Sequence, residues 1–121
     1  MKSMETILII EDEADIRESL ADVLELRGYN VVTVVNGREA LERLKAGLMP
    51  CLIILDLMLP VMSGWEFRRQ QLVNDKWANI PTVLVSGIAD LPGESQRLHA
   101  ASFLLKPIDL ASLYKTVDRY C

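Results

Sequence analysis

The chain has 121 residues, half of them apolar and a quarter charged, which suits one globular domain with a sizeable core. A formal net charge of -4 argues against direct nucleic-acid binding, which favours a basic stripe. No apolar stretch reaches membrane-spanning length, and residues 1–4 lack the apolar region of a signal peptide. The two cysteines, Cys51 and Cys121, lie far apart, which predicts no disulfide framework and a cytoplasmic location.

The first half of the chain alternates apolar runs with helical periodicity. Residues 7–10 form a short apolar run that predicts a strand buried on both faces, as in a parallel sheet. The following helix is predicted from apolar residues at helical spacing, which are Ile16, Leu20, Val23 and Leu24. Gly28 is placed to end that helix, and residues 31–35 predict a second strand. Asn36 is placed to cap a second helix, which Gly47 ends. Its inward positions are Ala40, Leu41 and Leu44.

A third strand and a third helix follow. Residues 51–55 form a further apolar run, which predicts a strand and leads directly into Asp56. Ser63 and Glu66 have the spacing of a capping box, so a helix is expected to begin near Gly64. Its expected packing residues are Trp65, Phe67 and Leu72.

The last part of the chain predicts two more strands, at residues 82–85 and 102–105. Pro92 and Gly93 lie between them, so the fourth helix should be short or frayed, and His99 near its end should be a surface residue. Asp109 is placed to cap the final helix. The apolar face of that helix is predicted at Leu110, Leu113, Tyr114 and Val117.

Five strand–helix units in succession predict an α/β domain with one parallel sheet. Because consecutive crossovers share one hand, the helices must cover both faces of the sheet. We therefore expect residues 1–121 to form a single, doubly wound, three-layer domain.

Polar residues stand where four of the predicted strands end, and ligands bind at the carboxyl ends of parallel strands. They are Glu11, Asp12, Asp56, Ser86 and Lys106. Three carboxylates suit a divalent cation such as Mg²⁺, and an ammonium and a hydroxyl suit a phosphoryl group. An aspartate can also carry that group covalently. Each residue alone could be a cap, turn or surface residue; the joint pattern at successive strand ends is far more specific.

The chain resembles the receiver domains of two-component response regulators over nearly its whole length. The matching segments are IIEDE at 9–13, LDLMLP at 55–60 with Gly64 beyond it, VSG at 85–87 and FLLKP at 103–107. The resemblance implies a flavodoxin-like, five-stranded parallel sheet in the order 2-1-3-4-5. It also implies a signalling domain that promotes only its own phosphorylation and dephosphorylation, rather than an enzyme acting on a separate substrate.

The resemblance implies a role for each site residue. Asp56 matches the aspartate that accepts a phosphoryl group from a histidine kinase or a histidine phosphotransfer protein. Asp12 and Glu11 match the acidic pair that holds Mg²⁺ beside Asp56, Glu11 through a water molecule, and the backbone carbonyl of Met58 matches a further ligand.

The resemblance further implies a conformational switch. Ser86 matches the switch hydroxyl, Lys106 the phosphate-contacting lysine and Phe103 the switch aromatic. The bond between Lys106 and Pro107 matches a peptide that is usually cis. The switch would regulate a downstream protein target, without direct nucleic-acid or membrane contact, by a monomer or weak dimer. The stretch from Ser86 to Lys106 looks short for the family, so the fourth helix should be atypical.

Three alternatives remain open. A phosphatase of the haloacid-dehalogenase type would usually need a second acid where Met58 stands. A flavin-binding domain of the flavodoxin type would need a phosphate cradle, whereas residues 11–15 are acidic. A degenerate receiver would bind partners without being phosphorylated, and the complete set of site residues argues against it.

Overall fold

The computed structural model describes residues 5–121, so the prediction for residues 1–4 lies outside it. The strands are β1 (Thr6–Ile10), β2 (Asn30–Val34), β3 (Leu52–Asp56), β4 (Thr82–Ser86) and β5 (Ser102–Leu105). The helices are α1 (Ala14–Leu26), α2 (Gly37–Lys45), α3 (Gly64–Leu72), α4 (Leu91–Arg97) and α5 (Leu110–Tyr120). All strand pairs are parallel and the sheet order is β2-β1-β3-β4-β5, which confirms the predicted fold. Within the described part of the chain, no helix is both long and apolar enough to cross a bilayer.

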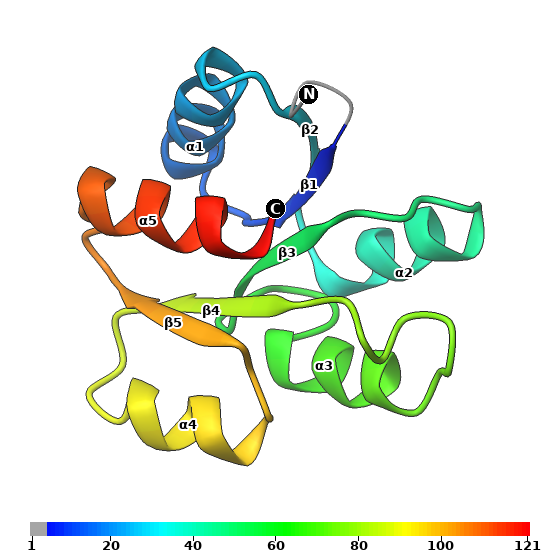
Figure 1. Cartoon of the computed structure of the whole chain (residues 1–121). Helices are drawn as coiled ribbons and strands as arrows, with labels where there is room; N and C mark the ends of the chain where they lie inside the picture. Colours follow the sequence, from blue (N-terminus) through cyan, green and yellow to red (C-terminus); the bar gives the residue numbers. More distant parts are fainter. Residues whose placement is uncertain (1–4) are drawn as a thin grey trace.

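Two apolar layers, one on each face of the sheet, form the core. Helices α1 and α5 cover one face, and α2, α3 and α4 cover the other (Figure 1). Side chains alternate along a strand, so Ile53 and Leu55 of β3 pack with α2, α3 and α4, whereas Leu52 and Ile54 pack with α1 and α5. β3 lies in the middle of the sheet and is buried along its whole length. Asp56 is therefore held by a strand that is enclosed on both faces.

Local signals in the sequence fix most helix ends. The predicted caps Asn36, Ser63 and Asp109 each accept a hydrogen bond from the backbone N–H three residues later. Gly28 and Gly47 follow the ends of α1 and α2 with φ values of 93° and 107°, a region that only glycine adopts without strain.

The fourth helix is short, as predicted, with seven residues from Leu91 to Arg97. His99 is exposed, as expected, but it lies beyond the helix with a φ of 52° rather than within it. The polypeptide turns there as the helix ends, where the His99 N–H bonds to the Gln96 carbonyl and the Ala100 N–H to the Ser95 carbonyl. A side chain from α3 binds the carbonyls of the two residues that follow α4.

That side chain is Arg68, which is only 4% exposed. It donates hydrogen bonds to the carbonyls of Leu98 (3.0 Å) and His99 (2.7 Å) and to the side chains of Gln71 (2.8 Å) and Thr82 (3.0 Å). Burial lowers the pKa of its guanidinium from the usual value. The network ties α3, β4 and the end of α4 together.

The prediction that the cysteines form no disulfide is wrong. Cys51, just before β3, is bonded to Cys121, just after α5, with 5.6 Å between their Cα atoms. The bond joins positions 70 residues apart, which meet only because α5 packs back across the sheet. The argument from these cysteines to a reducing compartment therefore does not hold.

Arg68→Ala should lower the free energy of unfolding by about 2–4 kcal/mol, because two carbonyls, Gln71 and Thr82 lose a buried charged donor. Urea denaturation measures the loss. The matched control is Arg69→Ala, since Arg69 is exposed and pairs only with Glu66 of the same helix, and it should change stability by less than about 0.5 kcal/mol. Equal effects of both substitutions would contradict this role for Arg68.

Candidate functional site

The predicted polar residues meet at the carboxyl edge of the sheet. Glu11 and Asp12 follow β1, Asp56 and Ser86 end β3 and β4, and Lys106 follows β5. Carboxylate oxygens of Glu11, Asp12 and Asp56 all lie within 4.8 Å of one another. The structure thus assembles the acidic cluster that the sequence predicts.

Lys106 supplies the positive charge inside this cluster. Its Nζ lies 3.0 Å from Asp56 Oδ2, 3.0 Å from Glu11 Oε1 and 3.4 Å from Glu13 Oε1. Burial alone would lower the pKa of Lys106, but its hydrogen bonds and charge interactions with Asp56 and Glu11 raise it above the usual value. Lys106 therefore stays an ammonium at neutral pH. Sequence reasoning missed Glu13, which looked like one more acid of an exposed loop.

Glu11 is the most deeply buried carboxylate of the site, at 1% exposure. Burial raises its pKa to about 7, and the nearby charge of Asp56 adds to the rise, against the lowering effect of the hydrogen bonds from the Glu13 backbone and Lys106. Its Oε2 accepts the Glu13 N–H at 3.1 Å. Its Oε1 lies 3.0 Å from Lys106 Nζ, and no other donor among the described residues contacts it. A buried carboxylate oxygen left in this way, beside two further carboxylates, fits the oxygen ligands that Mg²⁺ prefers.

The backbone around Asp56 fixes its side chain. Asp56 is 3% exposed, and its Oδ1 accepts the Met58 N–H at 3.0 Å. α3 begins directly against this segment, because a Cβ on Gly64 would lie 2.4 Å from the Asp56 carbonyl oxygen and 2.7 Å from the Leu57 Cα. Glycine at this position lets the helix start so close to the site. The predicted ligand role of the Met58 carbonyl stays a prediction.

The two residues predicted to form the switch, Ser86 and Phe103, lie on β4 and β5. Ser86 is 1% exposed; its Oγ accepts the Ile88 N–H at 3.3 Å, and its carbonyl accepts the Lys106 N–H at 3.0 Å. Phe103 is half-buried against the core layer of α2, α3 and α4. The peptide between Lys106 and Pro107 is cis, as predicted. The switch roles of Ser86 and Phe103 stay predictions.

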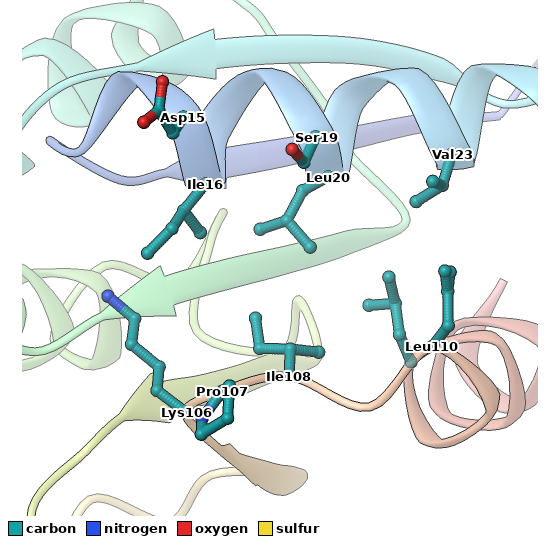
Figure 2. Close-up of a pocket in the computed structure, with 10 residues that line it drawn as sticks. Asp15, Ile16, Ser19, Leu20, Val23, Lys106, Pro107, Ile108 and Leu110 are labelled. Carbon is teal, nitrogen blue, oxygen red and sulfur yellow. The ribbon is translucent and has the colours of Figure 1, made fainter.

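A groove of about 330 Å³ opens beside Lys106, between α1 and the start of α5. Figure 2 shows Ile16, Leu20 and Val23 of α1 pointing toward the segment that carries Ile108 and Leu110. We call this surface the α1–α5 groove; its other lining residues are Asp15, Ser19, Lys106, Pro107 and Leu113. The prediction that Leu110 packs inward is wrong, since it is 40% exposed at the edge of the groove. Sequence periodicity missed the groove because it cannot separate a core face from an open apolar channel.

Comparisons with known proteins agree on one family. The family described as "Response regulator receiver domain" matches residues 7–118. Over 92% of its length the chain is 36% identical to Response regulator RR06 of Streptococcus pneumoniae, and it spans 50% of that protein. It is 31% identical to Sporulation initiation phosphotransferase F of Bacillus subtilis, over 96% of the chain and 93% of that protein.

The fold agrees with solved structures at similar identity. The response regulator TrrA of Thermotoga maritima, in complex with Mg²⁺–BeF, superposes with a TM-score of 0.86 at 28% identity, over 98% of this chain and 100% of that one. The chain spans about half the length or less of several further relatives, which are named as transcriptional regulators.

The raised pKa of Glu11 predicts a pH-dependent stability without metal. Because its pKa is about 7 when folded and about 4.5 when unfolded, its contribution is fully present below pH 4.5 and is lost as pH rises through 7. The loss should be on the order of 3 kcal/mol. Chemical denaturation in chelator across this range measures it, as the difference between wild type and Glu11→Gln. A difference that does not change with pH would contradict the shifted pKa.

Proposed function

The chain belongs to the response regulator receiver family, and on that basis we propose that Asp56 is the residue on which it carries a phosphoryl group. Receiver domains are the phosphoacceptor domains of two-component signalling systems. The observation that carries the proposal is the ion pair between Lys106 Nζ and Asp56 Oδ2, 3.0 Å long, at the edge that also holds Glu11 and Asp12. The proposed acceptor carboxylate therefore lies beside both an ammonium group and two further carboxylates that could bind a metal ion.

We infer that Glu11, Asp12 and Asp56 hold Mg²⁺, with the Met58 carbonyl as a further ligand. Support comes from the three clustered carboxylates, two of which, Glu11 and Asp56, are almost fully buried. When bound, the ion would neutralise the carboxylates and the oxygens of the transferring group. A pKa of about 7 for Glu11 means that a proton competes for the same oxygens below neutral pH.

The chain's own residues account for the transfer. An oxygen of Asp56 attacks phosphorus, the bond from phosphorus to the donor's histidine nitrogen breaks, and its electron pair stays on that nitrogen. Lys106 already touches Asp56 Oδ2 and stabilises the negative charge on the transferring oxygens. The Ser86 hydroxyl accepts from Ile88 N–H, so its own proton is available to donate to a phosphoryl oxygen. A shift of Ser86 toward that oxygen would leave space for the half-buried ring of Phe103.

The chemistry points to a signalling domain that promotes its own phosphorylation and dephosphorylation. Met58 stands two residues after Asp56, where the phosphatase alternative would usually place a second acid, and its side chain is 61% exposed. The acidic loop after β1 offers no cradle for a free phosphate, against the flavin-binding alternative. The downstream target would bind near Phe103, on the face of α4, β5 and α5. Because several relatives are named as transcriptional regulators, the expected lack of nucleic-acid contact stays a prediction.

The phosphodonor would dock a helix in the α1–α5 groove. The groove is apolar along α1 and ends at Lys106, so a helix lying in it would present a phosphohistidine at Asp56. Leu110, 40% exposed, adds apolar surface at the edge of the groove. The occupant that fits is the histidine-bearing helix of a sensor kinase or a phosphotransfer protein.

Incubation with acetyl phosphate and Mg²⁺ should add one phosphoryl group to the wild type, as intact-mass spectrometry would record. Omission of Mg²⁺ or substitution Asp56→Asn should abolish the gain, because either removes part of the site. The matched control is Asp22→Asn, an exposed acid on α1, which should be labelled like the wild type. No labelling of the wild type would favour the degenerate receiver.

Ile16→Glu should slow transfer from a phosphohistidine donor by about tenfold or more, because docking would bury an unpaired charge. Labelling by acetyl phosphate, which needs no docking, should be unchanged. Leu26→Glu is the control, since Leu26 lies on the same helix outside the groove and is 87% exposed. The assay uses a histidine phosphotransfer domain that phosphorylates the wild type. Equal donor rates for both variants would rule out the groove as the docking surface.

A further inference from the structure

The disulfide lies at the end of the molecule opposite the phosphorylation site. Cys51 precedes β3, whereas Asp56 ends it. Cys121 caps α5, with its N–H bonded to the Val117 carbonyl. Both cysteines are only partly buried, so a small thiol can reach them. The bond is therefore open to exchange and cannot act on Asp56 by contact.

Among the described residues 5–121, no group donates a hydrogen bond to one oxygen of a carboxylate beside the sulfurs. Glu5 offers an oxygen within 4.8 Å of both Sγ atoms. Its Oε2 is buried and accepts no hydrogen bond. A disulfide carries no hydrogen, whereas a thiol carries one that can be donated to a Glu5 oxygen or, from Cys51, to the Thr6 carbonyl 3.3 Å from its Sγ. Reduction therefore offers Glu5 a donor that the disulfide cannot supply, which favours a reversible site over a permanent cross-link.

The two ends of α5 are held differently. At its C-terminal end, Asp118 pairs with Arg27 and accepts the Tyr29 hydroxyl at 3.0 Å, and the Tyr120 hydroxyl donates to the Ala101 carbonyl at 2.9 Å. The disulfide adds a covalent attachment at the same end. At its N-terminal end, α5 borders the α1–α5 groove through Leu110 and Leu113. Apolar packing of Leu113 also holds the N-terminal half, but the ion pair, the tyrosine hydrogen bonds and the disulfide gather at the end far from the groove.

We propose that Cys51 and Cys121 form a thiol–disulfide exchange site whose redox state controls how firmly α5 is held and, through α5, the shape of the α1–α5 groove. The chemical class of its substrate is a dithiol protein or small dithiol as reductant, and a low-molecular-weight disulfide as oxidant. The effect on phosphotransfer rests on the proposed role of the groove in docking the donor; the exchange itself does not.

Reduction of the Cys51–Cys121 bond takes two successive thiolate attacks. A thiolate of the reductant attacks Cys121 Sγ, the bond to Cys51 breaks, and Cys51 leaves as a thiolate that takes up a proton. The second thiol of the reductant then attacks the mixed disulfide and frees Cys121 as a thiol. The protein gains two electrons and two protons, and the reductant becomes a disulfide. Oxidised glutathione drives the reverse reaction and is itself reduced to two thiols.

The first experiment measures the exchange. The full chain is equilibrated in buffers of reduced and oxidised glutathione, and its free thiols are alkylated and counted by intact mass. We expect a reversible change between no free thiols and two. Glu5→Gln should shift the equilibrium toward the disulfide by about fivefold, because the reduced state loses the charged acceptor. Failure to form the bond in oxidised glutathione, or no shift in the variant, would overturn the proposed site.

The second experiment measures the coupling to the groove. Reduction with dithiothreitol should lower the melting temperature by about 10 °C and increase hydrogen exchange in residues 108–113 relative to residues 40–44 of α2. Cys51→Ser should match the reduced wild type and should not respond to dithiothreitol. Unchanged exchange at residues 108–113 would overturn the coupling.

Labelling with acetyl phosphate distinguishes failure of the redox proposal from failure of the proposed phosphoacceptor function. Acetyl phosphate should label the oxidised and reduced proteins equally, because the site around Asp56 is untouched, whereas transfer from a histidine phosphotransfer domain should differ between them. Equal donor rates would overturn the redox control, and the phosphoacceptor function would still stand. Failure of acetyl phosphate in both states would instead refute the phosphoacceptor function, whatever the thiols do.

Discussion

Charge balance at the carboxyl ends of the strands is the constraint on which the site depends. Carboxylates of Glu11, Asp12 and Asp56 lie within 4.8 Å of one another, and burial of like charges this close is costly. Lys106 offsets part of that cost by contacting both buried acids at 3.0 Å, and the raised pKa of Glu11 offsets another part by keeping a proton in the cluster. In the proposed function, a bound cation would replace the proton on Glu11, and Lys106 would pair with the phosphoryl group.

The fold supplies the positions that this balance requires. β3 is enclosed on both faces and carries Asp56 to the edge, and Gly64 lets α3 start against the same segment. The Lys106 N–H bonds to the Ser86 carbonyl, so the backbone segments that carry the Lys106 ammonium and the Ser86 hydroxyl are joined directly. Side chains on strands, or directly after them, are positioned more precisely than side chains on long loops.

Local patterns made the fold and the acidic cluster predictable. Buried runs of four or five residues mark the strands, and the polar residue that ends each run marks the edge, so Asp56 and Ser86 could be placed from sequence alone. The disulfide between Cys51 and Cys121 could not, because it depends on where α5 crosses the sheet. The exposure of Leu110 has the same origin: periodicity gives the apolar face of a helix but not how far its neighbour stands away.

The central claim is that Asp56 itself carries the phosphoryl group. Borohydride reduces an acyl phosphate to an alcohol, so trapping after incubation with acetyl phosphate and Mg²⁺ converts a phosphorylated aspartate into homoserine. Peptide mass spectrometry then reads the modified position directly. We predict homoserine at position 56 and aspartate at position 12. Homoserine at another acid, with aspartate kept at position 56, would contradict it.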